Sequence, residues 1–229
     1  MGINILHFGL NRSGTNYLKE LVDNHFDVIF LNTEEERDHP LHKHFRLYDD
    51  KSLIGRPNFI NDKQFRSFAE FEQILPAGSV VSAYIIISKD PYSWNLSYRN
   101  WGIKNNWPAS PHPFILEYNA FYGKWLQFSK ETDKIAFVRY IDLLSDPEAT
   151  LGGLRDRFNL PEKKKISKIR RVKKVPMSHR FSASRVNYYL QEKYLDDYKT
   201  EELEELNRHL DHDLIQQLGY QSRPLRSNK

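Results

Sequence analysis

The segment FGLNRSGTNYL, residues 8–18, carries residue types that could bind a phosphate group. Its glycines Gly9 and Gly14 have the G-x-x-x-x-G spacing of the Walker loop, and glycine allows backbone geometry that other residues resist. A strand-like apolar run precedes the loop and a helical pattern follows it, so the first N–H groups of that helix would converge on an anion. The segment therefore predicts an anion-binding turn between a strand and a helix.

The residues beside Gly14 argue against a magnesium-dependent nucleotide site. A Walker loop continues with Lys and then Ser or Thr, whereas this chain has Thr15 and Asn16. Asn16 cannot supply the hydroxyl that binds magnesium, and the cationic side chain lies inside the loop, at Arg12. We therefore expect the loop to bind phosphate without a metal. The alternative is a tight strand-to-helix turn that carries a solvent-exposed arginine.

Strands and helices alternate along the chain, which predicts an α/β fold with a central parallel sheet covered by helices on both faces, a three-layer α/β/α arrangement. Residues 33–63 give no periodic signal and are expected to form a long functional loop. The expected strands are residues 3–10, 27–32, 79–88 and 134–140. The expected helices are residues 14–25, 64–75, about 91 onward, about 114–130 and 146–158, with a last helix whose leucine stripe runs from Leu203 to Leu218.

The composition is that of an ordinary folded protein, with 39% hydrophobic and 28% charged residues in a chain of 229. The net charge of +4 suits an anionic ligand. The absence of cysteine excludes a disulfide framework, a thiolate zinc site and a thiol nucleophile. The sequence shows neither a signal peptide nor an apolar run long enough to span a membrane, so a cytoplasmic location is the expectation.

The octapeptide NRSGTNYL, residues 11–18, resembles the phosphosulfate-binding loop of sulfotransferases. Members of that family have a P-loop kinase-like fold and use 3′-phosphoadenosine 5′-phosphosulfate (PAPS) as a sulfuryl donor without a metal, releasing 3′-phosphoadenosine 5′-phosphate (PAP). The resemblance implies that the loop holds the phosphosulfate and that Arg12 neutralises the leaving 5′-phosphate. The implied donor-binding residues of the loop are Asn11, Arg12, Ser13, Gly14, Thr15 and Asn16.

A second match, ISKDPYSWNLSYRN at residues 87–100, is similar to the 3′-phosphate segment of the same family. It implies that Lys89 and Ser97 bind the donor's 3′-phosphate. A cation at the end of a strand and a hydroxyl about two helical turns later can reach one phosphate. The family usually has arginine where this chain has Lys89, which keeps the charge but loses the bidentate geometry. By itself, the pair Lys89 and Asp90 could be only a solvated turn that caps a helix.

A third match, FVRYIDLLSDPEATLGGLRDRFNL at residues 137–160, resembles a family segment with a strand, a capped helix and a leucine face, although Ile141 replaces the usual glutamate. The three matches follow the family's order. The resemblance covers about residues 3–160 and extends more weakly to a helical segment at about 184–220. The whole chain, residues 1–229, is therefore expected to form one domain.

The densest positive charge lies late in the chain, between residues 160 and 185. In sulfotransferases a late basic segment closes over the 3′-phosphate, and the resemblance implies the same here. The alternatives are a solvated basic loop and a patch that attracts a polyanionic acceptor or nucleic acid. No nucleic-acid-reading motif accompanies the charge, which argues against nucleic acid as the main partner. The candidates are Arg170, Arg171, Lys173, Lys174, Arg180 and Arg185.

The polar segment at residues 32–50 supplies candidate general bases. Sulfuryl transfer, like phosphoryl transfer, depends on in-line positioning, charge stabilisation and a base for the acceptor hydroxyl. Cytosolic sulfotransferases have a Lys-x-His element between their nucleotide motifs, and Lys43 and His44 lie in that interval without matching the spacing. We predict that His44 is the base and that Lys43 assists it. The other candidates are Glu34, Glu35, Glu36, His39 and His42.

For any single histidine of this segment, a loop position without a catalytic role is the simpler interpretation. Three histidines lie within six residues, at His39, His42 and His44, but their spacing matches no recognisable set of metal ligands. We therefore expect no metal site. Tyr17 and Trp94 are expected to pack in the core rather than to stack on adenine.

Together these features predict a metal-independent sulfotransferase that uses PAPS and acts on a hydroxyl or amine of a carbohydrate or small molecule. One alternative is a P-loop nucleotide or small-molecule kinase, which would need a magnesium ligand at the loop. Another is a non-catalytic nucleotide-binding protein of the same fold. The sequence identifies neither the acceptor nor the oligomeric state.

Overall fold

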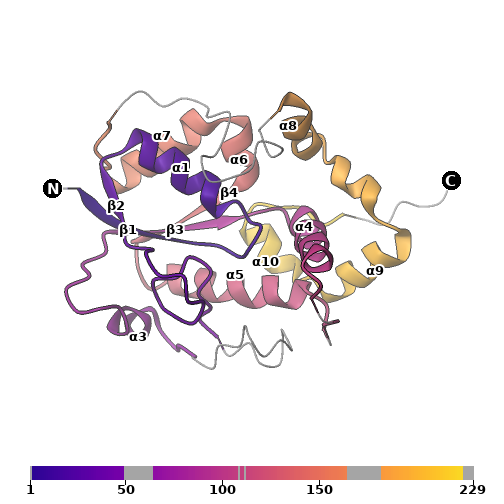
Figure 1. Cartoon of the computed structure of the whole chain (residues 1–229), viewed down its shortest axis with the longest axis horizontal. Coiled ribbons are helices and arrows are strands. Elements are labelled where there is room, and N and C mark those ends of the chain that lie inside the picture. The colour runs from indigo at the N-terminus through magenta and orange to yellow at the C-terminus, as the bar shows by residue number, and fades with distance from the viewer. Residues whose placement is uncertain (1, 49–63, 108, 111, 164–181, 224–229) are drawn as a thin grey trace.

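A parallel sheet lies at the centre of the molecule. The computed structural model describes residues 2–48, 64–107, 109–110, 112–163 and 182–223. Within them, four strands pair in the order β2-β1-β3-β4, all parallel (Figure 1). Phe8 of β1 lies beside Ile86 of β3, so the carboxyl ends of these two strands are neighbours. The strands are β1 (Ile3–Phe8), β2 (Val28–Phe30), β3 (Ala83–Ser88) and β4 (Ile135–Arg139).

Helices cover both faces of the sheet (Figure 1), and each face has its own cluster of buried apolar side chains. This three-layer arrangement with a parallel central sheet confirms the predicted α/β/α fold class. One face carries α1 (Thr15–His25), α6 (Tyr140–Ser145) and α7 (Pro147–Phe158). The other carries α3 (Phe68–Gln73), α5 (Ile115–Ser129) and α10 (His212–Gln217).

The remaining helices lie beyond the carboxyl ends of the strands (Figure 1). They are α4 (Pro91–Lys104), α8 (Ala183–Leu190), the 3-10 helix η3 (Lys193–Asp197) and α9 (Thr200–His209). The chain leaves β1 toward α1 on one face, but it leaves β3 toward α4, whose Tyr92 and Trp94 belong to the core of the opposite face. Adjacent strands whose connections diverge in this way leave a crevice, which is where open α/β sheets bind ligands.

The sequence explains why these elements form. All six residues of β3 are buried, because a parallel strand covered on both faces needs an apolar run. In β1, Ile5 belongs to one apolar cluster and Leu6 to the other, as the alternation of strand side chains requires. The prediction that α4 begins at Pro91 is confirmed. Asp90 caps this helix by accepting hydrogen bonds from the N–H groups of Tyr92 at 3.1 Å and Ser93 at 3.0 Å.

Three predicted elements differ clearly from the structure. The helix predicted over residues 64–75 begins only at Phe68. The last helix is not continuous, because Leu210 is extended (φ −74°, ψ 131°) and Asp211 starts a new helix by accepting a hydrogen bond from Leu214 N–H. The strand predicted over residues 79–88 begins only at Ala83, since Ser79 still belongs to a turn with Pro76. Within the described segments, every helix is too short or too polar to cross a bilayer.

Candidate functional site

The loop between β1 and α1 has the backbone geometry that its glycines suggested. Gly14 has φ 102°, and a Cβ there would lie 2.5 Å from Cδ2 of Tyr140. A Cβ on Gly9 would lie 2.5 Å from Oγ of Ser13. Arg12 is exposed and also has a positive φ, 74°, which costs a non-glycine residue about 1–2 kcal/mol. Such strain is typical of functional sites.

A pocket of about 250 Å³ opens at this loop, in the crevice between the ends of β1 and β3. It brings together the predicted loop residues, the predicted pair Lys89 and Ser97, and His44. Ser13 is buried beneath the loop rather than in the lining. The lining residues are Asn11, Arg12, Gly14, Thr15, Asn16, Tyr17, His44, Lys89, Ser97, Trp101, Tyr140, Arg185 and Tyr189.

Lys89 is a buried cation at the end of β3, with only 4% of its surface exposed. Its Nζ donates hydrogen bonds to Oγ of Ser97 at 3.0 Å and to the hydroxyl of Tyr189 at 3.4 Å. Burial lowers the pKa of Lys89, Tyr189 opposes this shift, and the cations Arg12 and Arg185 add to it. A positive charge held away from water is strongly attracted to an anion, so this position suits a phosphate.

Tyr189 of α8 is a lining residue that the sequence analysis missed. The ammonium group of Lys89 lies 4.5 Å from the centre of its ring. Burial by itself would raise the pKa of Tyr189, but Lys89 and Arg185 outweigh burial and lower it. Of the six late basic candidates, Arg185 lines the pocket. The other five lie outside the described residues: Arg170, Arg171, Lys173, Lys174 and Arg180.

His44 lies at the opposite side of the loop, 8% exposed. Its Nδ1 is 2.6 Å from the carbonyl oxygen of Gly9. A carbonyl only accepts, so Nδ1 carries the proton and Nε2 is left with a lone pair. Burial lowers the pKa of His44 well below 6.5, the bond to Gly9 opposes this, and the charges of Lys43 and Arg46 add to it. His44 is therefore neutral at pH 7, the state that a general base requires.

The other candidates of residues 32–50 are placed differently. Lys43 lies beside the loop, where its Nζ donates to Oδ1 of Asn16 at 2.6 Å and its carbonyl accepts from Gly9 N–H at 3.1 Å. His42 has its pKa lowered to about 4, first by burial and then by Arg37. Lys43, His39, His42, Glu34, Glu35 and Glu36 are not among the described lining residues of this pocket. Among the residues that the structure describes, no group of three or more His, Asp or Glu could hold a metal ion.

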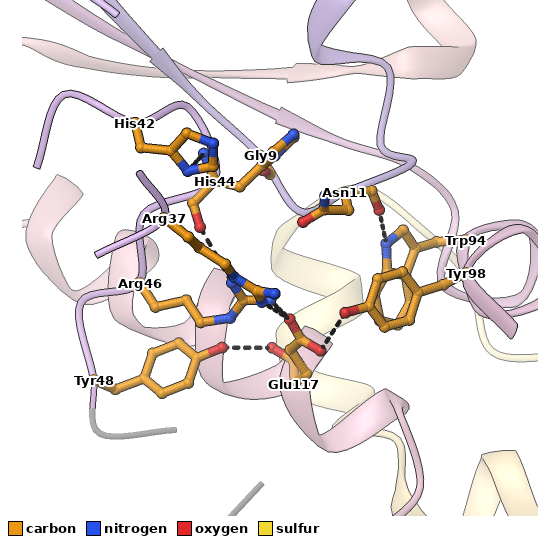
Figure 2. Close-up of polar contacts among 10 residues, drawn as sticks. All are labelled: Gly9, Asn11, Arg37, His42, His44, Arg46, Tyr48, Trp94, Tyr98 and Glu117. Carbon is orange, nitrogen blue, oxygen red and sulfur yellow. Dashed lines mark hydrogen bonds and ion pairs between the residues drawn. The ribbon is translucent and has the colours of Figure 1, made fainter. Parts of the chain in front are cut away.

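Trp94 packs in the core, as predicted, and it also supports the loop. It is fully buried, and its indole N–H donates to the carbonyl oxygen of Asn11 at 2.9 Å (Figure 2). Near it lies a charged cluster of the buried pair Glu117 and Arg46 with the partly buried Arg37, which the sequence analysis did not identify. The sequence signal available for this cluster was a glutamate within the otherwise aromatic run FILEYNAFYGKW, residues 114–125.

The chain was compared with protein families, curated proteins and solved structures. No protein-family model matches the chain, and no curated protein matches its sequence. A crystal structure of the mouse sulfotransferase SULT7A1 complexed with PAP is similar, with a TM-score of 0.47 and 10% sequence identity over 95% of this chain and 88% of that one.

Two further solved structures are similar over most of their length. The sulfotransferase domain from the curacin biosynthetic pathway has a TM-score of 0.48 and 16% identity, over 97% of this chain and 99% of that one. A sulfotransferase from Alicyclobacillus acidocaldarius has a TM-score of 0.41 and 10% identity, over 92% of this chain and 97% of that one. With TM-scores below 0.5, these likenesses carry no weight for function, which rests on the residues of the pocket.

Proposed function

We propose that this protein, as a single domain, is a metal-independent sulfotransferase. It would transfer the sulfuryl group of PAPS to a hydroxyl or amine of a carbohydrate or small-molecule acceptor. The observation that carries the proposal is that one pocket holds a phosphate-type loop at one side and the Lys89–Ser97 pair at the other. Two separate anion sites in one crevice suit a donor that carries phosphate at both its 5′ and 3′ positions.

In this proposal the loop binds the 5′-phosphosulfate. The N–H groups at the start of α1 point toward the bound anion, and the guanidinium of Arg12 contacts it from the solvent side. Lys89 and Ser97 bind the 3′-phosphate. Arg185 and Tyr189 of α8 lie where they can add a charge-assisted contact and a hydroxyl contact to the same group. Tyr17, as predicted, packs in the core, where its ring meets that of Tyr140 edge to face, and both buried rings also reach the pocket lining.

The reaction would be an in-line displacement at sulfur. The acceptor oxygen forms a bond to sulfur while the bond from sulfur to the bridging oxygen of the 5′-phosphate breaks, and PAP leaves with that electron pair. The negative charge that develops on the leaving oxygen is stabilised by Arg12 and the loop amides. Nε2 of His44 takes the proton of the acceptor hydroxyl, because this nitrogen is unprotonated when Nδ1 donates to Gly9.

Calorimetric titration tests the proposal. We expect PAP to bind in the absence of metal, and Arg12→Ala to weaken it by about 10- to 100-fold, the size of a lost hydrogen bond between charged groups. ATP with Mg²⁺ is the comparison ligand. Preference for ATP with Mg²⁺ would instead indicate a kinase. Binding of neither nucleotide would contradict a catalytic role and leave a protein that keeps the fold without the chemistry.

A further inference from the structure

A group of charges centred on the buried residue Glu117 lies close to His44 and to the loop that begins at Gly9 (Figure 2). Glu117 of α5 and Arg46 are each only 1% exposed and form an ion pair. Arg37 contributes a second guanidinium, with Nη2 3.4 Å from Oε1 of Glu117. The hydroxyl of Tyr98 donates to Oε2 of the same carboxylate at 3.0 Å, and the hydroxyl of Tyr48 donates to the Glu117 carbonyl at 3.3 Å. Four side chains thus converge on one residue.

Stability alone does not account for such a cluster. Removing charges from water costs several kcal/mol per ion, and apolar side chains of the same volume often stabilise a core as well or better. Buried ion pairs are best understood where they fix one arrangement of the chain among several. Glu117 contacts residues that lead to two parts of the chain, the His44 segment and the loop that begins at Gly9.

One set of contacts leads from Glu117 to the predicted base. Arg46, held by the carboxylate, donates from Nη1 to the carbonyl oxygen of His44 at 3.2 Å. His44 in turn donates from Nδ1 to the carbonyl of Gly9 at 2.6 Å. The backbone of His44 is thus held from below by the ion pair, and its ring is held from the side by the start of the phosphate-type loop. Figure 2 shows this line of contacts.

A second set leads from Glu117 to the same loop by another path. The ring of Tyr98, oriented by its bond to the carboxylate, stacks on Trp94 with centroids 4.8 Å apart and an angle of 20° between the planes. Trp94 donates to the carbonyl of Asn11 at 2.9 Å. Asn11 and Gly9 are two residues apart, so the two paths from Glu117 end on the same turn of chain (Figure 2).

We propose that Glu117 is a positioning residue that fixes the His44 ring relative to the loop. Its carboxylate holds Arg46 under His44 on one side and Tyr98 under Trp94 on the other, so that the base and the leaving-group site keep a constant separation. The inference rests on the proposed function. Glu117 does not act on the substrate itself, because it is 1% exposed and is not one of the pocket's described lining residues.

Nuclear magnetic resonance of ¹⁵N-histidine-labelled protein reads this positioning directly. The His44 signals are identified by their absence from His44→Gln. At pH 7 the wild type should show Nδ1 protonated and Nε2 unprotonated. In Glu117→Gln and in Arg46→Met we expect both nitrogens to shift toward values averaged between the two tautomers, because each variant removes the support of the His44 carbonyl. Turnover of PAPS should fall by about 10- to 100-fold, as a displacement of about 1 Å can produce.

Two controls separate positioning from general damage. Glu72→Gln removes another carboxylate that binds a tyrosine hydroxyl and a cation, although a more exposed one. It accepts from Tyr84 at 3.0 Å and from Nζ of Lys134 at 2.8 Å, and its loss should leave the His44 signals unchanged. The double variant Arg46→Met with Glu117→Met removes the buried pair together, which preserves folding better than removing one partner. It should still show the altered His44 signals.

The outcomes distinguish this inference from the proposed function. PAP affinity should change by less than about threefold in Glu117→Gln, because an amide oxygen can still accept from the Tyr98 hydroxyl and the Lys89 site is untouched. His44 signals that stay at wild-type positions in Glu117→Gln, Arg46→Met and the double variant would overturn the positioning role. A wild type that binds no PAP would overturn the proposed function, while the signals would still decide what Glu117 does.

Discussion

The two sides of the pocket are built very differently. On the His44 side, residues 44–48 are all buried, and Arg46 and Tyr48 among them contact Glu117. On the opposite side, α8 supplies Arg185 and Tyr189, yet none of its residues is buried. A segment with few buried contacts opens at a lower free-energy cost than one fixed in the core. In the proposed reaction, the group that needs accurate placement, His44, lies on the well-supported side, whereas the proposed ligand contacts Arg185 and Tyr189 lie on a thinly packed helix.

The largest effect is expected from the supported side. His44→Gln should lower the turnover of PAPS by about 10²- to 10⁴-fold, the usual contribution of a general base. PAP affinity should be nearly unchanged. The measurement is PAP release with the best acceptor from a panel of sugars and phenols. His42→Gln is the matched control, because His42 lies in the same segment but outside the described lining of the pocket.

The pH profile sharpens this prediction. The pKa of His44 lies well below 6.5, so the histidine is already unprotonated at pH 6.5 and stays so as the pH falls toward its lowered pKa. Turnover should therefore not fall on passing from pH 7.5 to about 6. A drop centred near pH 6.5 that is absent from His44→Gln would mean that His44 titrates as an exposed histidine, contrary to its buried setting.

Substitutions in α8, on the thinly packed side, should have a smaller effect, and it should be on PAP affinity rather than on turnover. Tyr189→Phe and Arg185→Met should each weaken PAP binding by about tenfold, the value of one hydrogen bond near a charge, with little change in turnover at saturating PAPS. Tyr188→Phe is the control, since its hydroxyl donates instead to Asp197 at 2.5 Å. A loss of turnover without a loss of affinity in Tyr189→Phe would reverse the comparison between the two sides.

The smallest expected effect is on the pH dependence of the free energy of unfolding, through His7, which is bound to the start of the His44 segment. His7 of β1 is 1% exposed, and its Nδ1 is 2.7 Å from Oδ1 of Asn32, at the start of the segment that leads to His44. Burial is the main cause that lowers the pKa of His7 to about 3, while the bond to Asn32 opposes it.

Below pH 6.5 the unfolded chain therefore binds a proton at His7 that the folded chain excludes, and stability falls as the pH falls. The proton that His7 binds only in the unfolded chain lowers the free energy of unfolding at pH 6 by about 0.8 kcal/mol relative to pH 8. Urea unfolding of the wild type and His7→Gln at both pH values measures this difference. An equal loss of stability in both proteins would show that His7 is not the source.

The sequence could predict features whose residues lie close together along the chain. The loop at residues 9–16 lies between one strand and the helix that follows it, and Lys89 and Ser97 lie between β3 and the second turn of α4, so spacing along the chain already determines both arrangements. Glu117 could not be predicted in this way. Its partner Arg46 is remote in sequence, and a glutamate in a helix is normally exposed. The predicted last helix failed for a related reason: its leucine stripe is continuous, but the cap at Asp211 overrides the pattern.

The bond between Trp94 and Asn11 has one more consequence. Trp94 and Ser97 belong to the same continuous helix, α4, so the loop cannot move away from Ser97 without breaking the indole bond. This bond therefore restrains the distance between the two proposed anion sites. In the proposed reaction, nucleotides would be selected by the span between their phosphate groups. Adenosine 5′-phosphosulfate, which lacks the 3′-phosphate, would reach only the loop site and would leave the charge of Lys89 unneutralised, although its base is the same as that of PAPS.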